Sequence, residues 1–143
     1  MAYPAIAPNI YRKLGGPQVF KGHLATDVDL ARVVHAGVST KALNFTSLSK
    51  DEVHAFVINA RTLRHRKAKN EPLTPDETDK LLRLTRIQAI AEEVFEDAGK
   101  ADRWLRQPLN ILDDKTPLEF ASTEPGARVV EQILAKIEWG AAA

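Results

Sequence analysis

Three helix-start signals constrain the fold of this chain more than any other sequence feature. Each has Ser or Thr at the capping position and Glu three residues later, so the hydroxyl and the carboxylate each bind a backbone amide left free at a helix N-terminus. They are Ser49-Lys50-Asp51-Glu52, Thr74-Pro75-Asp76-Glu77 and Thr116-Pro117-Leu118-Glu119. Proline at the first helical position strengthens the last two, because its missing N–H would be unpaired there anyway. Since no segment alternates as a strand does, we predict an all-α fold.

Capping residues, glycines and prolines also predict where the helices begin and end. Asp27 or Asp29 would cap a short helix that Gly37 ends, and Gly99 would break the long helix that follows Thr74. Residues 1–26 contain several breakers, so we expect an irregular or loosely helical lead-in. The expected helices cover residues 27–35, 39–44, 49–57, 60–67, 74–97, a short stretch ended by Pro108, 116–121 and 124–138.

Apolar spacing predicts which helices are buried. In the long helix, Leu84, Ile87, Ala91 and Val94 recur at helical spacing. Further apolar residues widen this stripe beyond one packing face; they are Leu81, Leu82, Ile90 and Phe95. We therefore expect this helix to be buried on two sides. The last helix has a single apolar face, made of Val130, Ile133, Leu134 and Ile137.

Charge divides the chain into two parts of opposite sign. Residues 1–70 hold 11 Lys and Arg against 4 Asp and Glu, a net charge of +7, whereas residues 71–143 hold 9 against 15, a net charge of −6. A basic surface concentrates polyanions and an acidic surface repels them, which favours two partners of different sign. The alternative is a head-to-tail dimer in which the two parts neutralise each other.

The segment from Asn59 to Asn70 carries most of the basic charge. It contains Arg61, Thr62, Arg64, His65, Arg66, Lys67 and Lys69 and no acidic residue. If residues 60–67 are helical, Arg61, Arg64 and His65 share one face while Leu63 points back to the preceding helix. A short helix, a tight turn and a basic helix with one apolar anchor are typical of a helix-turn-helix, whose second helix enters the DNA major groove. Arginine suits base recognition, and Lys67 and Lys69 suit phosphate contacts.

Two observations oppose this interpretation. Most basic runs are solvated faces beside a linker, which is the alternative reading of residues 59–70. In addition, the turn at Ile58-Asn59 is short and lacks the glycine that is often found in such turns. We therefore expect a helix-turn-helix-like element that need not dock in the standard geometry.

The sequence lacks the patterns of catalytic and metal sites. It has no Cys, no glycine-rich phosphate loop, no metal-binding His-Glu motif and no nucleophile elbow, and its four His are scattered. Glu92-Glu93 and Asp113-Asp114 are adjacent pairs whose side chains diverge on a helix. No apolar run approaches the roughly 20 residues of a membrane span, and the proline-containing start does not look like a signal peptide. We expect a cytoplasmic protein that is not an enzyme and has no cofactor, metal or membrane partner.

Several short motifs, in order, resemble the Xre/MbcA/ParS family of antitoxins. The stretch from Trp104 to Glu119, then Thr123 to Arg128, then Val130 to Gly140, resembles that family's toxin-binding domain. The upstream segment with Arg61-Thr62-Leu63, followed by Leu73-Thr74 and residues 89–95, resembles Xre-type members with an N-terminal DNA-binding region. The resemblance covers most of residues 27–140.

The resemblance implies an antitoxin of a type II toxin-antitoxin system. Its partner would be a RES-domain toxin from the same operon, an NAD-depleting enzyme similar in fold to ADP-ribosyltransferases. It implies a DNA-binding and dimerisation region in residues 1–70, which would repress the operon by binding operator DNA, and a toxin-binding domain in residues 71–143. The implied toxin-binding residues are Trp104, Arg128, Glu131, Lys136, Glu138, Trp139 and Gly140.

Two other functions fit the same residues. In one, the protein is a helical binding module whose basic helix docks on an acidic protein and touches no DNA. In the other, it is a plain transcriptional repressor whose acidic part senses a ligand or dimerises, without a toxin partner.

Overall fold

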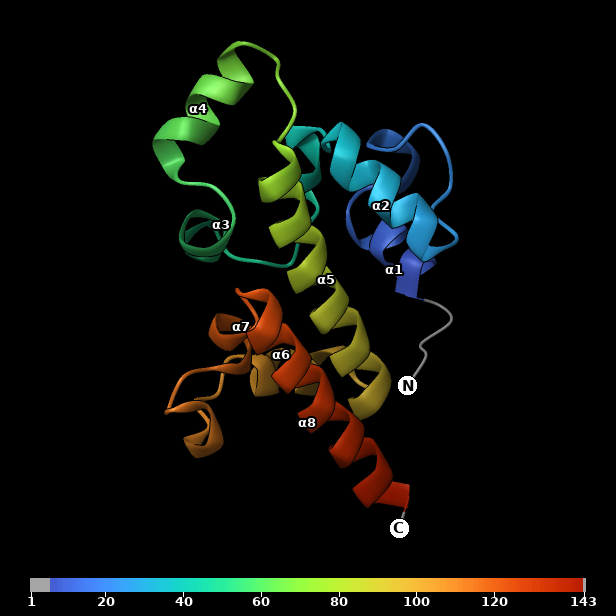
Figure 1. Ribbon diagram of the computed structural model, residues 1–143, viewed down its shortest axis with the longest axis vertical. Helices are drawn as coiled ribbons and strands as arrows, with labels where there is room; N and C mark the ends of the chain where they lie inside the picture. Colours follow the sequence, from blue (N-terminus) through green and yellow to red (C-terminus); the bar gives the residue numbers. More distant parts are fainter. Residues whose placement is uncertain (1–5, 143) are drawn as a thin grey trace. The chain divides into compact units, whose positions relative to one another are not determined.

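The computed structural model describes residues 6–142, whose regular elements are helices joined by turns and loops (Figure 1). The α-helices are α1 (Ile6–Lys13), α2 (Asp27–Ala36), α3 (Lys50–Phe56), α4 (Ala60–Ala68), α5 (Pro75–Phe95), α6 (Ala98–Leu105), α7 (Pro117–Phe120) and α8 (Glu124–Ala142). Three short 3₁₀ turns join them: η1 (Gly16–Gln18), η2 (Thr40–Asn44) and η3 (Asn110–Leu112). The described part contains one isolated β-bridge, between Leu109 and Lys115, and no strand. The prediction of an all-α fold is confirmed.

The helix-start signals form as predicted. Ser49 and Thr116 each take part in a complete capping box at the start of α3 and α7. At the start of α5, the amide of Thr74 donates to Glu77 Oε1 over 2.8 Å, and the amide of Glu77 donates to Thr74 Oγ1 over 3.2 Å. Each signal therefore satisfies two amides that the helix itself leaves unpaired.

Two local expectations were wrong, and a third, the irregular or loosely helical lead-in, is met only in part. The cap of α2 is Thr26, not an aspartate, and Asp29 closes a capping box from the third helical position. Gly99 lies inside α6 instead of breaking the helix; the chain turns at Glu96, which has a φ of 54°, and Asp97 caps α6. The lead-in is more ordered than expected, because α1 is a regular helix with Ile6 and Ile10 buried.

The chain forms two compact units, residues 4–82 and a second unit that contains residues 83–143. The division falls inside α5, between Leu82 and Arg83, and not at residue 70, where the sign of the charge changes. Residues 4–82 hold 12 Lys and Arg against 8 Asp and Glu, and residues 83–143 hold 8 against 11. The two units thus keep net charges of opposite sign, but these charges differ less than those of residues 1–70 and 71–143 do.

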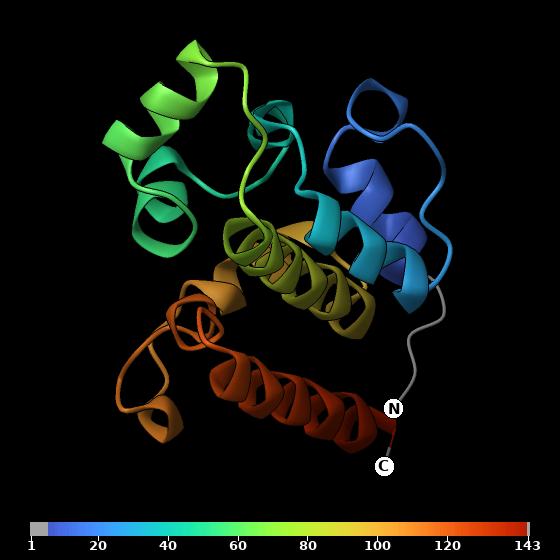
Figure 2. The ribbon, with the colours of Figure 1, turned by 45° about the horizontal axis from the view of Figure 1, so that its top comes forward.

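In the first unit, the start of α5 is tied to the segment after α2. The amide of Val38 donates to the buried Thr78 Oγ1 over 3.1 Å, and the amide of Leu73 donates to the Val38 carbonyl over 2.8 Å. Helices α1 and α2 pack together, as both views show (Figures 1 and 2). The same unit contains α3, α4 and the turn between them.

In the second unit, α7 packs against α6 and α8. Its core contains Ile87, Ile90, Leu105, Leu118, Val130 and Leu134. Arg83 donates to the Ser122 carbonyl over 3.1 Å, and Arg86 pairs with Glu131 over 3.2 Å. Residues 87–91 of α5 are all buried, which confirms that this helix is covered on more than one side. No helix in residues 6–142 is both long and apolar enough to cross a membrane.

Candidate nucleic-acid and partner interfaces

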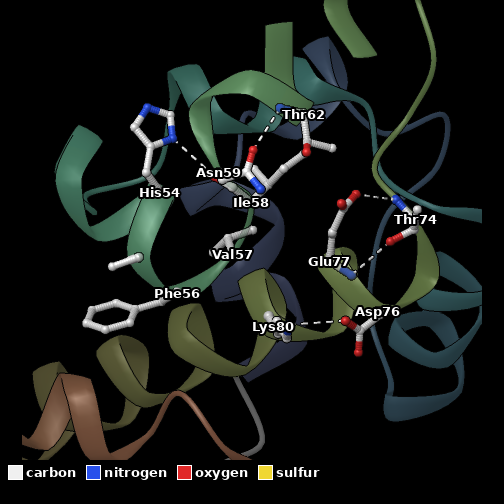
Figure 3. Close-up of a pocket in the computed structure, with 11 residues that line it drawn as sticks. His54, Phe56, Val57, Ile58, Asn59, Thr62, Thr74, Asp76, Glu77 and Lys80 are labelled. Atoms are coloured by element: carbon white, nitrogen blue, oxygen red, sulfur yellow. Dashed lines mark hydrogen bonds and ion pairs between the residues drawn. The ribbon is translucent and has the colours of Figure 1, made fainter. Parts of the chain in front are cut away.

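The turn between α3 and α4 forms without glycine. The amides of Val57 and Ile58 both donate to the Val53 carbonyl, over 2.9 and 3.0 Å, which closes the end of α3. Both side chains are buried, and neither residue has a positive φ. His54 Nδ1 lies 3.1 Å from the Ile58 carbonyl, so this nitrogen is the one that donates (Figure 3). Buried valine and isoleucine therefore replace the flexible glycine that the sequence lacks.

Helix α4 then starts at a well-formed cap. Asn59 Oδ1 accepts a hydrogen bond from the Thr62 amide over 2.8 Å (Figure 3). Thr62 was expected to contact DNA. The Asn59 cap was not predicted, although an Asn at the start of the basic run is its sequence signal. Thr62 is half-buried in the structure and serves the start of the helix.

The exposed face of α4 carries a compact basic group. Leu63 is buried, as predicted, and anchors the opposite side of the helix. Arg61, Arg64 and His65 are all exposed, and Ala68 lies among them at helical spacing. An exposed alanine leaves room for a surface to approach the three basic side chains closely.

In the part of the chain that the structure describes, no ion pair neutralises these cations. Within residues 6–142, Arg61, Arg64, Lys67 and Lys69 form no ion pair, and all four are exposed. Such a group of unneutralised charges attracts a polyanion and is screened by salt. The structure therefore brings five of the seven predicted DNA-contacting residues to exposed positions on or beside α4.

Arg66 is the exception among the basic residues of α4. Its guanidinium binds both carboxylate oxygens of Glu77, over 2.7 and 3.2 Å, and also the Pro72 carbonyl over 3.3 Å. The two side chains are only 17% and 14% exposed. Arg66 therefore holds the end of α4 against the start of α5 and does not lie with the exposed basic group.

A pocket of about 310 Å³ lies between this turn and the start of α5 (Figure 3). Its wall includes His54, Asn59 and Glu77, together with an ion pair between Asp76 and Lys80 of 3.1 Å. Because its polar groups bind one another, we read this pocket as a crevice between packed elements. Among residues 6–142, no three His, Asp or Glu side chains gather as metal ligands would.

The predicted toxin-binding residues fall into two groups. Trp104 packs against Phe95, with ring centroids 5.6 Å apart, and Glu131 is paired with Arg86, so both stabilise their own unit. The second group shares α8 with Glu131 and consists of Arg128, Lys136, Glu138, Trp139 and Gly140. Arg128 pairs with Glu124 over 2.7 Å on the surface, and Glu138 is half-buried. Trp139 is 65% exposed, so it does not pack in the core of its own unit.

Comparisons with known proteins match both units. Residues 29–86 match the antitoxin Xre-like helix-turn-helix domain, and residues 91–140 match the antitoxin Xre/MbcA/ParS C-terminal toxin-binding domain. These two ranges include the α3–turn–α4 element with its exposed basic group and the α8 surface with Trp139.

Curated relatives are similar over most of the chain. An antitoxin Xre of Pseudomonas putida is 40% identical over 95 residues, which are 66% of this chain and 57% of that protein, so the match spans little more than half of that relative. The Prs ADP-ribosylating antitoxin of Sphingobium sp. is 29% identical over 131 residues, 82% of each chain. An antitoxin Xre of Yersinia enterocolitica is 31% identical over 98 residues, 67% of this chain and 66% of that protein. The chain therefore belongs to the Xre/MbcA/ParS antitoxin family and combines an Xre-like helix-turn-helix domain with a C-terminal toxin-binding domain.

Proposed function

We propose that the protein is the antitoxin of a type II toxin-antitoxin system, which binds a RES-domain, NAD-degrading toxin and represses its own operon. The observation that carries the DNA-binding part is the exposed, unneutralised basic face of α4, which follows a short buried turn after α3. A recognition helix needs this placement, because one side must be anchored while the other enters the major groove.

Each exposed basic residue on or beside α4 has a role in this proposal. Arg61 and Arg64 contact base edges, since a guanidinium can bind O6 and N7 of guanine together. His65 approaches the bases beside them. Lys67 and Lys69 bind phosphates and fix the register of the helix along the groove. A homodimer would present two such helices to two half-sites, one helical turn of DNA or a multiple of it apart.

The toxin-binding part of the proposal places the contact on α8. Trp139 is a large apolar side chain held in solvent, a combination that favours an interface anchor. Lys136 and Gly140 are exposed near it on the same helix. The name of the Sphingobium relative links an antitoxin to ADP-ribosylation, which supports a partner toxin with NAD chemistry. Such a partner would place the complex in the cytosol.

The DNA-binding proposal is tested with two double variants that remove equal charge. One is Arg61→Ala with Arg64→Ala, and the control is Arg12→Ala with Lys21→Ala, two exposed cations outside α3 and α4. We expect the first variant to lose binding to the duplex upstream of its own operon and the control to keep it. The affinity of the unmodified protein should fall steeply with salt, because phosphate contacts release counterions. Equal binding by both variants would refute the assignment of α4.

The toxin-binding proposal is tested by co-purification with the product of the neighbouring reading frame. We expect a stable complex in which the neighbour no longer consumes NAD. If no complex forms while DNA binding persists, the protein is a plain repressor. If a complex forms and no DNA binds at any salt concentration, it is a protein-binding module.

A further inference from the structure

The loop between α6 and α7 presents an apolar side chain to solvent. Ile111 is 76% exposed, more than any other large apolar side chain in residues 6–142, whereas the next residue, Leu112, is fully buried and anchors the loop. The amides of Leu109 and Asp114 close the loop by donating to the Lys115 and Leu109 carbonyls, over 3.1 and 3.0 Å. The loop therefore holds Ile111 in water, where an apolar side chain is unfavourable.

Two aspartates follow Ile111 on the same loop. Asp113 and Asp114 are both exposed, and within residues 6–142 neither forms an ion pair. Their φ values of 56° and 62° are left-handed, a conformation that Asp and Asn tolerate better than most residues with a side chain. Lys115 is also exposed and offsets one of the two negative charges. The loop thus presents one apolar side chain beside a net negative charge.

The first unit has a pocket of the opposite character. The pocket has a volume of about 300 Å³, and its apolar lining consists of Leu43, Leu48, Val53, Ala60 and Leu63. Asn44 and His54 line it too, and its other charged side chains are Lys50, Arg64 and Lys67. Asp51 and Glu52 lie next to Lys50 on α3 but do not line the pocket, and Glu52 Oε1 accepts the Ser49 amide over 2.9 Å. The pocket is therefore apolar and bordered by cations, with no carboxylate in its lining.

We infer that the loop Leu109–Lys115 of one copy docks in this pocket of a second copy. Ile111 then leaves water for the apolar lining, and the two aspartates meet cations that have no ion-pair partner within residues 6–142. The opposite net charges of the two units favour the same pairing. Because the loop and the pocket are different surfaces, the contact is head to tail, and it repeats into chains or rings.

This contact hides part of the exposed basic group. Arg64 and Lys67 belong both to that group and to the pocket, so a docked loop and a bound duplex compete for them. A single loop in a single pocket buries little area, so the association is weak, appears only at high protein concentration and is weakened by salt. The competition with DNA rests on the proposed function, but the self-association does not.

The test measures self-association by analytical ultracentrifugation without DNA, over a series of protein concentrations at low and high salt. We expect Ile111→Ser to weaken the association several-fold. Asp113→Asn with Asp114→Asn should do the same, since asparagine keeps the left-handed conformation and removes only the charge. The matched control is Lys115→Ala in the same loop, which should strengthen the association, because it makes the loop more negative.

Mixing two variants tests the head-to-tail arrangement. Lys50→Glu with Lys67→Glu disables the pocket and keeps the loop, whereas Ile111→Ser disables the loop and keeps the pocket. Neither variant should associate alone, but a mixture should form one-to-one pairs, because one intact loop still meets one intact pocket. An interface made of the same patch on both copies would not be restored in this way.

The outcomes separate this inference from the proposed function. It is overturned if the unmodified protein does not associate at low salt, or if the loop variants associate as it does. It is also overturned if Ile111→Ser weakens only the complex with the neighbouring gene product, since the loop would then belong to that interface. At concentrations that favour association, Ile111→Ser should bind the operon duplex several-fold more tightly than the unmodified protein. If no DNA binds, the proposed function fails and the self-association result stands.

Discussion

Arg66 and Glu77 join the end of α4 to the start of α5 through two hydrogen bonds, from Nη1 to Oε1 over 2.7 Å and from Nη2 to Oε2 over 3.2 Å. Glu77 Oε1 also accepts the Thr74 amide over 2.8 Å, so one carboxylate both caps α5 and holds α4. The planar guanidinium forms two parallel bonds that fix direction as well as distance. The position of the basic face of α4 therefore depends on the first turn of α5.

This pair makes Arg66 and Arg61 behave differently although they are close in sequence. Arg66→Ala leaves the mostly buried Glu77 without its charge partner, and we expect the free energy of unfolding to fall by about 2 kcal/mol. Arg61→Ala removes an exposed cation and should change it by less than about 0.5 kcal/mol. Urea unfolding followed by circular dichroism measures both values.

The two variants should affect DNA specificity in the reverse order: Arg61→Ala should lower the preference for the operon duplex, and Arg66→Ala should not. Arg61→Ala should weaken binding to the operon duplex more than to a shuffled duplex, because a base contact is lost. Arg66→Ala should weaken both duplexes alike through the displacement of α4. Equal unfolding free energies for the two variants would contradict the structural role of Arg66.

The two glycines of α8 should respond differently to substitution, because only Gly126 lies close against another part of the backbone. A Cβ on Gly126 would lie 1.8 Å from the Phe120 carbonyl oxygen, whereas a Cβ on Gly140 would meet nothing within 4 Å. Gly126→Ala should therefore destabilise the protein by about 1–3 kcal/mol, since the α7–α8 connection must move. Gly140→Ala should stabilise it slightly, because alanine favours the helical state. Thermal unfolding of both variants, followed by circular dichroism, checks the prediction, and a stabilised Gly126→Ala protein would be incompatible with this packing.

The sequence predicts those features that depend on local contacts. The starts of α3, α5 and α7 are made by residues three apart, so their capping boxes are readable from spacing alone. The pair between Arg66 and Glu77 joins residues 11 apart, and only the folded chain shows that it removes Arg66 from the exposed basic group. The unit boundary within α5 was equally hidden, since no glycine or proline interrupts the helix at Leu82 and Arg83.

The other errors have local causes, either a competition between similar residues or the position of a helix breaker. Thr26, Asp27 and Asp29 are all good capping residues, and the choice depends on which oxygen reaches the Asp29 amide. The breakers in residues 1–26 suggested an irregular lead-in, yet Gly15, Gly16 and Pro17 follow the end of α1, and Pro8 lies in its first turn, where proline is tolerated.

The two tryptophans should separate stability from toxin binding. Trp104 is half-buried against Phe95, so Trp104→Ala should lower the free energy of unfolding by about 2 kcal/mol. Trp139→Ala should leave it nearly unchanged, since this side chain is 65% exposed. On the proposed function, Trp139→Ala should weaken the toxin complex by about 2 kcal/mol, measured by titration calorimetry. A Trp139→Ala protein that binds the toxin as tightly as the unmodified protein would remove Trp139 from the interface.

The start of α2 should be sensitive to acid. The pKa of Asp29 lies below its ordinary value of 3.8, because its carboxylate accepts the amides of Ala25 and Thr26 and lies near Arg32. Since the folded pKa is the lower one, the carboxylate contributes stability above its ordinary pKa, and this contribution is lost as pH falls through the folded value. The Ala25 and Thr26 amide resonances should therefore titrate with a midpoint below 3.8, and Asp29→Asn should abolish that transition while leaving other carboxylates unaffected. A midpoint at or above the ordinary value would show that this capping box does not form in solution.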